Sequence, residues 1–476
     1  MAFSEYAKYD GLGLAELVAK KEVTPTELIE EAIARIEKHN PRINAVVYKT
    51  YDRARTAARA PQGSRAFAGV PFLLKDILGV QKGVPTRQGS AFVPAAPSPH
   101  DAFLTKKFTA AGLISLGKTN VPEFGLVPTT ESALYGPARN PWNLEHSTGG
   151  SSGGSGAAVA AGIVPLAHAN DGGGSIRAPA SANGLVGLKP TRGRTSLGPD
   201  LGDIMGGLVS EGVVSRTVRD TAAILDAIAG NEPGDPYVAP PKPKSYLDES
   251  MTPPAKLRIG FATKDLYGRK LHAECLTAIE STAKLLQSMG HTVEEASPPL
   301  PIETLAGAFM PVWASGLAML IDGIGFLTNR TPHENDFQGL TWGLYQVGRQ
   351  VTAAQYQMCW FQLQGAARQV AAWHETYDIW LNTTFGAPPV RNGTFDFNEK
   401  DPEKGFAPII EYLPVTAVQN ATGQPALTLP LHWSAQGLPV GVHFVARFGD
   451  ETTLLRLAGQ LEKARPWKDR HPPNWN

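Results

Sequence analysis

The segment from Gly149 to Pro179 reads GGSSGGSGAAVAAGIVPLAHANDGGGSIRAP, and the interpretation of the whole chain depends on it. The chain has 476 residues and 49 glycines, which concentrate around this segment. The alanine-rich residues 155–163 predict a helix, residues 164–168 form a short apolar run, and another helix is expected to open at 175–177. Short apolar strands that alternate with helices imply an α/β fold with a mixed sheet covered on both faces.

The same rhythm of strands and helices continues on both sides of this segment. Thr24 to Glu27 has the pattern of a capping box, and the helix that it opens is expected to stop at His39 to Pro41. Residues 68–74 form a short apolar run typical of a buried strand, and Lys75 follows directly at the end of this strand. Other predicted elements are helices near 105–111, 273–289 and 452–463, strands near 113–116, 257–262, 291–293, 425–430 and 439–445, and a mainly helical stretch at 302–377.

Composition excludes several classes of protein. Lys+Arg and Asp+Glu both number 44, so nothing favours a nucleic-acid partner, and a small uncharged or mixed substrate is expected. Cys275 and Cys359 lack the spacing of a metal or redox site and are expected to be plain buried thiols. We find no signal-peptide pattern and no uninterrupted apolar run of ~18 residues, so no membrane span is expected. Together these features favour a reducing cytoplasm.

The first glycine cluster, Gly149 to Gly156, lacks the Lys-Ser or Lys-Thr of a phosphate loop and the third glycine of a dinucleotide-binding loop. A flexible linker fits poorly, because alanine and valine continue directly into a helix. Gly150 to Gly154 matches the G-x-S-x-G pattern of a nucleophile elbow centred on Ser152. An elbow needs a preceding strand, whereas residues 140–148 are loop-like. A Ser–His–Asp hydrolase that uses Ser152 stays open as an alternative.

The second cluster places three glycines directly before Ser175, at an expected helix start. Such a loop can turn several backbone N–H groups toward one point, and the helix start adds partial positive charge. An oxyanion that formed beside Ser175 would find donors there. Taken alone, however, the cluster is better explained as a tight turn with an N-capping serine.

Several long motifs occur in one order along the chain. They are Lys75-Asp76, Gly117-Lys118-Thr119-Asn120, Gly149 to Gly156, Asp171 to Pro179, Gly187-Leu188-Lys189-Pro190, Gly423 to Ala426 and Gly437 to Gly441. The set resembles the amidase signature family over almost the whole chain. It is closest in look to bacterial hydrolases of nylon-type cyclic oligomers and of aryl amides or carbamates.

The resemblance implies a single α/β/α core around a large mixed β-sheet flanked by helices. Length alone, at roughly 150 residues per domain, would instead suggest about three domains. The implied single domain covers residues 1–476, with a catalytic core at about 65–230. The C-terminal half, at about 257–476, is expected to complete the sheet and to shape the substrate pocket.

The resemblance also implies the site residues. The family's nucleophile falls on Ser175, its bridging serine after a cis peptide bond on Ser151, and its base on Lys75. The oxyanion donors correspond to the backbone N–H groups of Gly172, Gly173, Gly174 and Ser175. One departure is Thr148, where many relatives carry proline, and it puts the rigidity of this loop in doubt.

These residue types suit acyl transfer. Lysine is a base only when neutral, so its pKa near 10.4 must fall, and burial behind Val70 to Leu74 would lower it. Lys75 would then accept a proton from Ser151, which accepts one from Ser175, and an acyl-enzyme would form. Asp171 and Arg177 are expected to brace the loop as a charge pair. Neither a metal nor an organic cofactor is expected.

The predicted function is an amidase-type serine hydrolase that cleaves C–N bonds, with aryl amides, oligoamides and carbamates as candidate substrates. One alternative is the A subunit of a tRNA-dependent amidotransferase, which would need partner subunits and a carboxylate/arginine arrangement for glutamine. A non-catalytic binding protein is disfavoured, because all three catalytic positions are filled. The expected partner is a small-molecule amide or carbamate, and the expected assembly is a monomer or homodimer. The aromatic stretch at 302–377 and residues 382–412 are expected to shape the pocket.

Overall fold

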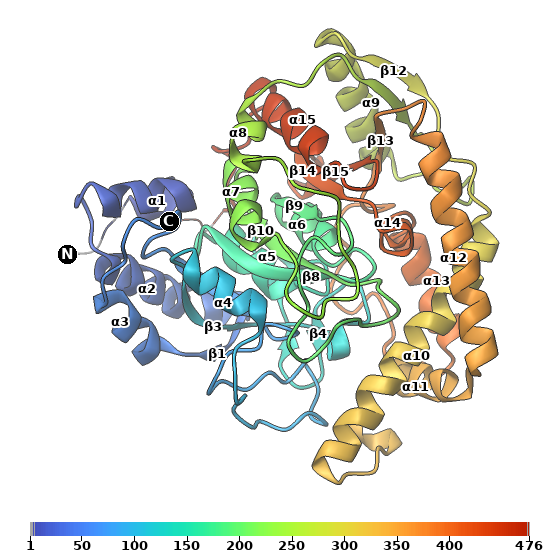
Figure 1. Ribbon diagram of the computed structural model, residues 1–476, viewed down its shortest axis with the longest axis horizontal. Coiled ribbons are helices and arrows are strands. Elements are labelled where there is room, and N and C mark those ends of the chain that lie inside the picture. Colours follow the sequence, from blue (N-terminus) through green and yellow to red (C-terminus); the bar gives the residue numbers. More distant parts are fainter. Residues whose placement is uncertain (1–2, 4, 474, 476) are drawn as a thin grey trace.

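The computed structural model describes residues 3, 5–473 and 475 and is built around an eight-stranded mixed sheet (Figure 1). The strand order is β12-β11-β13-β15-β14-β9-β10-β8. β11 is parallel to β12 and β13, and the other neighbours are antiparallel. The strands are β8 (Leu166–Asp171), β9 (Val186–Lys189), β10 (Ser210–Ser215), β11 (Arg258–Phe261), β12 (Thr292–Glu295), β13 (Ile379–Thr383), β14 (Ala426–Trp433) and β15 (Pro439–Ala446).

Strands from distant parts of the chain meet in this sheet. β9 pairs with β14, which lies more than two hundred residues later, so the two halves share one layer. The predicted large mixed sheet is therefore present. The predicted assignment of residues 65–230 to catalysis and 257–476 to the pocket stays a prediction at this point.

A second, three-stranded sheet positions Lys75. Its order is β1 (Val46–Lys49), β3 (Ile114–Thr119) and β2 (Pro71–Lys75), with β2 parallel to β3. Every residue of β2 is buried, in agreement with the apolar run PFLL that precedes Lys75. β2 also packs beside β8, the edge strand of the large sheet, which brings the end of one sheet against the other.

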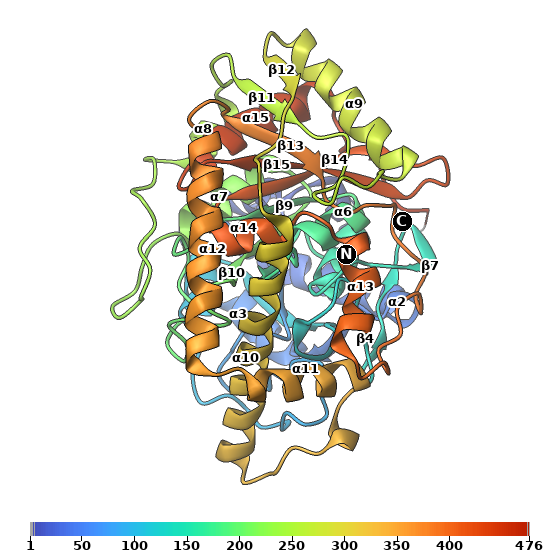
Figure 2. The same ribbon diagram turned by 90° about the vertical axis from the view of Figure 1, so that its right-hand side faces the viewer.

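Helices cover the large sheet on both faces (Figure 2). In this view α9 (Ala273–Ser288) and α15 (Glu451–Ala464) lie above strands β13, β15 and β14, whereas α6 (Arg177–Asn183) and α14 (Ala417–Thr422) lie below them. The remaining helices of the core and the N-terminal region are α1 (Gly11–Ala19), α2 (Pro25–Ile43), α3 (Tyr51–Arg59), α4 (Phe103–Ala110), α5 (Gly153–Ala160), α7 (Val218–Ile228) and α8 (Tyr246–Met251).

The predicted helical stretch at 302–377 is present as three helices. They are α10 (Ile302–Thr328), α11 (Gly339–Gln350) and α12 (Ala353–Trp373), and α13 (Pro402–Tyr412) stands beside them (Figure 2). Among the described residues, α10 has the length and composition of a membrane-spanning helix, although half of its apolar window is buried inside the protein. A buried core helix passes the same test, so this feature is a weak indication of a span.

Two local predictions were wrong. α2 begins with the predicted capping box of Thr24 and Glu27 but continues through Pro41 to Ile43. Proline usually disrupts a helix, because it lacks the N–H and crowds the preceding turn, but here the helix continues for two more residues and buries Ile43. Residues 140–148 are not all loop, because β7 (Asn143–Ser147) pairs with β6 (Arg139–Asn140). The N–H of Ser147 also donates to the carbonyl of Val390, a partner that local sequence does not reveal.

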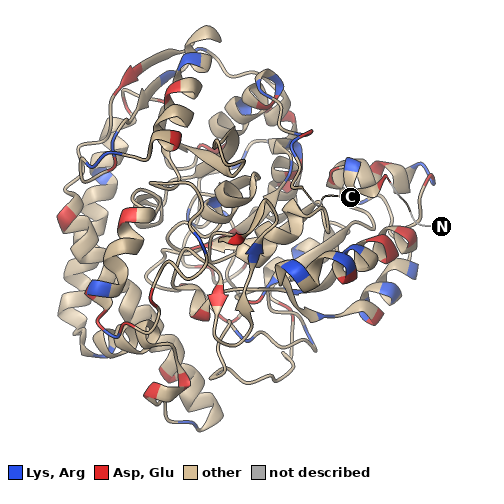
Figure 3. Cartoon of the chain, turned by 180° about the vertical axis from the view of Figure 1, so that it is seen from behind, with Lys and Arg blue, Asp and Glu red and all other residues tan. Residues whose placement is uncertain are grey.

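Charged residues lie mainly on the outer elements, with both signs interspersed (Figure 3). This distribution agrees with the equal numbers of basic and acidic residues. The short remaining elements are η1 (Tyr6–Lys8), η2 (Glu123–Gly125), η3 (Glu334–Asp336), β4 (Glu131–Ser132) and β5 (Gly136–Pro137).

Candidate active site

Lys75 ends strand β2 with its side chain fully buried. Its Nζ lies 2.8 Å from Ser151 Oγ and 2.5 Å from Asn170 Oδ1. The amine therefore contacts the hydroxyl that the family resemblance pairs with it, and not solvent. Asn170 was not predicted as a site residue, although it directly precedes Asp171 in the second motif.

The surroundings of Lys75 change its acid–base behaviour. Burial lowers the pKa of Lys75 to about 7, even though the negative charges of Glu211 and Asp171 act in the opposite direction. A large fraction of this amine is therefore neutral near neutral pH, as a base requires.

A buried histidine and carboxylate hold the backbone at Lys75. The N–H of Lys75 donates to Nδ1 of His168 at 3.2 Å, and Nε2 of His168 lies 2.7 Å from the Glu211 carboxylate. Because Nδ1 accepts, the ring proton sits on Nε2 and is donated to Glu211. β8 supplies His168 and its antiparallel neighbour β10 supplies Glu211, so the large sheet orients the lysine of the small one.

Ser151 follows a cis peptide bond with Gly150, as the resemblance implied. Gly150 cannot be replaced without movement of the backbone, because a Cβ there would lie 2.5 Å from the carbonyl oxygen of Thr129. Ser151 is buried, and the only hydrogen bond of its hydroxyl to a described residue is the one to Lys75.

Ser175 stands in the loop between β8 and α6. Ser175 is 9% exposed, and it lines a cavity together with Gly150 and Gly173. Its hydroxyl makes no hydrogen bond to any described residue, and none joins it to Ser151. The hydroxyl is therefore available to a molecule that enters the cavity.

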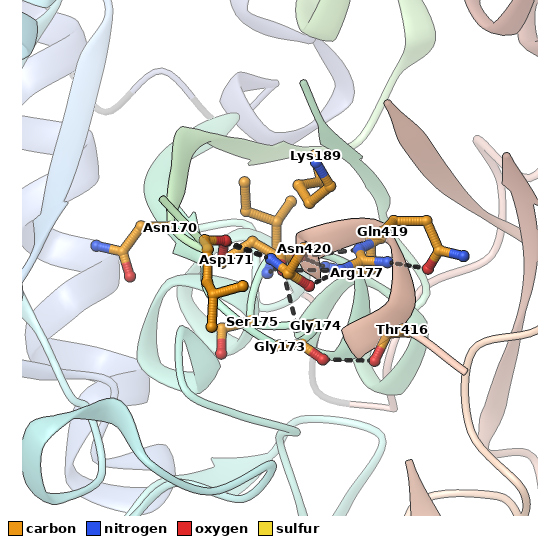
Figure 4. Close-up of polar contacts among 12 residues, drawn as sticks. Asn170, Asp171, Gly173, Gly174, Ser175, Arg177, Lys189, Thr416, Gln419 and Asn420 are labelled. Carbon is orange, nitrogen blue, oxygen red and sulfur yellow. Dashed lines mark hydrogen bonds and ion pairs between the residues drawn. The ribbon is translucent and has the colours of Figure 1, made fainter. Parts of the chain in front are cut away.

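The carboxylate of Asp171 organises the glycine loop (Figure 4). It accepts from the N–H groups of Gly174 at 2.7 Å and of Ile176 at 3.1 Å. It also forms the predicted ion pair with Arg177, at 2.8 Å. Although burial alone would raise the pKa of Asp171, the Arg177 guanidinium holds it below its ordinary value. Asp171 is therefore ionised and accepts at full strength.

This arrangement divides the four predicted oxyanion donors into two groups. The N–H of Gly174 already has an acceptor in Asp171. The N–H groups of Gly172, Gly173 and Ser175 have none among the described residues and remain available. The loop conformation itself requires glycine at 174, where φ is +141° and a Cβ would meet Thr416 Oγ1 at 2.5 Å.

Residues from the C-terminal half complete the loop, and sequence reasoning did not find them. Thr416, at the start of α14, donates from its hydroxyl to the carbonyl of Gly173 at 2.6 Å (Figure 4). Asn420 donates to the carbonyl of Asp171 at 2.8 Å and accepts from Arg177 at 2.7 Å. The available signal was their position just before the motif at Gly423 to Ala426.

Ser152 has a different role from Ser151. It is fully buried, and its hydroxyl donates to the carbonyls of Ser175 at 2.5 Å and of Asn170 at 3.3 Å. Both partners are backbone carbonyls and neither is a histidine, so this geometry supports the loop of Ser175 and gives no support to a nucleophile elbow at Ser152.

The cavity beside Ser175 is lined partly by the segments predicted to shape it. α10 contributes Leu305, Phe309 and Trp313, and α13 contributes Phe406 and Ile409. The aromatic residues of α11 and α12 do not line it. Within residues 3, 5–473 and 475, no group of three or more His, Cys, Asp or Glu is placed to hold a metal ion.

Comparison with known proteins gives matches over almost the whole chain. A family model described as Amidase matches residues 27–455. The 6-aminohexanoate-cyclic-dimer hydrolase of Paenarthrobacter ureafaciens is 38% identical, over 97% of this chain and 96% of its own. The solved structure of a 6-aminohexanoate cyclic dimer hydrolase with substrate superposes with a TM-score of 0.93, at 37% identity, over 99% of this chain and 100% of that chain. A bacterial aryl acylamidase of the amidase signature family superposes with a TM-score of 0.88, at 27% identity, over 96% of both chains.

Proposed function

Since the chain belongs to the amidase family and is an amide hydrolase, we propose that it works through an acyl-enzyme on Ser175, with Ser151 as proton relay and Lys75 as base. The observation that carries the proposal is the buried amine of Lys75, 2.8 Å from Ser151 Oγ. Burial brings the pKa of this amine to about 7, where it can both accept and return a proton.

In the first half of the reaction Ser175 Oγ attacks the carbonyl carbon of the amide. Its proton passes to Ser151 Oγ, while the proton of Ser151 passes to the neutral amine of Lys75. The hydroxyls of Ser151 and Ser175 must approach when substrate binds, and such bonds are often long in substrate-free enzymes. The oxyanion accepts from the available N–H groups of Gly172, Gly173 and Ser175.

Collapse of the tetrahedral intermediate breaks the C–N bond. The leaving nitrogen takes a proton from Ser151, which is restored from the ammonium of Lys75, and an ester on Ser175 remains. Water then attacks this ester and gives its proton to Lys75 through Ser151. Release of the acid returns the proton to Ser175, so the cycle consumes one water and needs no other reactant.

The substrates that we propose are small neutral amides, with oligoamides, aryl amides and carbamates as candidates. The names of the similar proteins, a cyclic-dimer hydrolase and an aryl acylamidase, favour the first two. A cytoplasmic location and a monomeric or homodimeric state stay predictions.

The amidotransferase alternative finds no support in the cavity. Recognition of free glutamine would require partners for its carboxylate and ammonium groups. None of the described residues that line the cavity beside Ser175 is Asp, Glu, Lys, Arg or His. Release of ammonia from glutamine by the purified chain, at a rate comparable with that for neutral amides, would restore this alternative.

Covalent labelling tests the choice of nucleophile. A fluorophosphonate is expected to modify Ser175, because its hydroxyl faces the cavity, and to spare Ser152, whose hydroxyl is buried against two carbonyls. Mass mapping of the labelled peptide gives the position. An adduct on Ser152 would favour the nucleophile elbow, and an unlabelled protein that still turns over amide would exclude a serine acyl-enzyme.

The rate is expected to depend on the ionisation of Lys75. Below its pKa of about 7 the protonated amine cannot accept a proton, so kcat/KM for a neutral amide should rise with pH through this value and then level. Glu211→Gln removes a negative charge that raises the pKa of Lys75, and should move this rise to lower pH. A rate independent of pH between about 5 and about 9 would contradict Lys75 as the base.

A further inference from the structure

The cavity beside Ser175 is a built apolar pocket. It has an empty volume of about 860 Å³, part of which is open to solvent. Phe309 and Trp313 of α10 stack with ring centroids 5.7 Å apart and form part of its wall. Ile409 and Leu413 face it from α13 and the residue that follows this helix.

The wall has very little polar character. Among the described residues that line it, the side chains with polar atoms are those of Ser175, Tyr267 and Trp313. None of the lining residues is Asp, Glu, Lys, Arg or His. An ion that enters such a pocket loses its water and finds no opposite charge, which is costly in free energy.

The buried ion pair of Arg177 and Asp171 cannot help such an ion. Arg177 is fully buried, and its guanidinium already binds Asp171, Gln419 and Asn420. In Figure 4 the hydroxyl of Ser175 points away from Arg177, Asp171 and Lys189. These groups therefore lie on the side of the loop opposite to the cavity, and each guanidinium nitrogen of Arg177 is already hydrogen-bonded.

We propose that the substrate group that enters this pocket is an uncharged hydrocarbon chain or aromatic ring. This group is attached next to the scissile bond, and the pocket excludes charged groups. This inference rests on the proposed function, because it concerns the substrate of the same serine. It narrows the candidates to amides in which one side of the C–N bond is bulky, apolar and free of charge.

Matched substrates test the proposal in two arms. One arm compares hexananilide with 6-aminohexananilide and with the monoanilide of adipic acid, which carry a charge at the far end of the acyl chain. The other compares acetanilide with its 4-carboxylate and 4-aminomethyl derivatives, which carry a charge on the ring. In the series whose charged group enters the pocket, kcat/KM for the charged substrates should be about 100-fold or more below that for the neutral parent. Losses below about 10-fold in both arms would overturn the proposal.

A pair of variants tests the role of the wall directly. Met310, a partly exposed lining residue of α10, has nearly the same shape as glutamate and glutamine. Met310→Glu should raise kcat/KM for the ammonium substrate, relative to the neutral one, about 10-fold, whereas Met310→Gln should leave this ratio unchanged. An unchanged ratio in both variants counts against the proposal.

Fluorophosphonate labelling separates this proposal from the proposed function. The rate of labelling at Ser175 measures the reactivity of the catalytic groups and does not depend on which substrates the pocket accepts. If Ser175 is labelled normally and charged substrates are still accepted, the pocket assignment alone fails. If Ser175 is not labelled in the unmodified protein, the catalytic proposal fails first.

Discussion

Ser175→Ala is expected to lower kcat about 10⁴-fold or more, because the attacking atom is lost and the remaining groups can only polarise the amide. The cavity and the glycine loop should persist, since the Ser175 hydroxyl makes no hydrogen bond to another described residue. Substrate should still bind with an affinity close to that of the unmodified protein. Single-turnover rates with an anilide and equilibrium binding of the same anilide measure the two quantities.

A serine outside the site gives the matched control. Ser288 is exposed near the end of α9, and its hydroxyl donates to the carbonyl of Leu285 in the same helix. Ser288→Ala should leave kcat unchanged. Retention of substantial activity in Ser175→Ala, with purity checked by fluorophosphonate labelling, would remove Ser175 from the mechanism and leave the proposed acyl-enzyme without a nucleophile.

Lys75→Met is expected to lower kcat/KM by about 10³-fold and to abolish the rise with pH near neutrality. Methionine fills the space of the lysine chain without an amine, so Ser151 has no base. The change also leaves Asn170 Oδ1 without the amine that it contacts at 2.5 Å, and a buried unpaired acceptor costs about 1–3 kcal/mol. Thermal unfolding should accompany the kinetics, so that loss of fold is not mistaken for loss of the base.

Lys118 gives a stringent control, because it is a second fully buried lysine on the adjacent strand β3. Burial lowers its pKa to about 8, and its amine bonds to the carbonyl of Gly79 and the hydroxyl of Thr86, not to Ser151. Lys118→Met should retain the pH-dependent rise that Lys75→Met loses. If only Lys118→Met removes the rise, the base has been assigned to the wrong lysine.

Local sequence patterns predicted the elements that depend on local interactions. The capping box of Thr24 and Glu27 starts α2, and the short apolar run before Lys75 is the buried strand β2. Glycine at 150 and 174 marks positions where the backbone admits no side chain. These signals are legible because a cap, a buried strand and a crowded turn restrict the residue types at their own positions.

The same reasoning failed where the partner is distant. Residues 143–147 form a strand, with bonds to Val390 as well as to β6, and nothing in the local pattern indicates it. Thr416 and Asn420 reach the loop of Ser175 from the far end of the chain, and a contact of this kind exists only after the sheet has brought the two halves together.

The sequence by itself determined which residue types stand where the proposed acyl transfer needs them: a lysine at a strand end, a serine after Gly150 and a serine after three glycines. Only the tertiary structure decided their chemistry. The pKa of Lys75 falls because β8 and its neighbours exclude water from the amine. The N–H of Gly174 is not available to an oxyanion because it already donates to the carboxylate of Asp171. Desolvation and hydrogen-bond competition depend on everything that packs around a group, and that surrounding set is assembled from segments hundreds of residues apart.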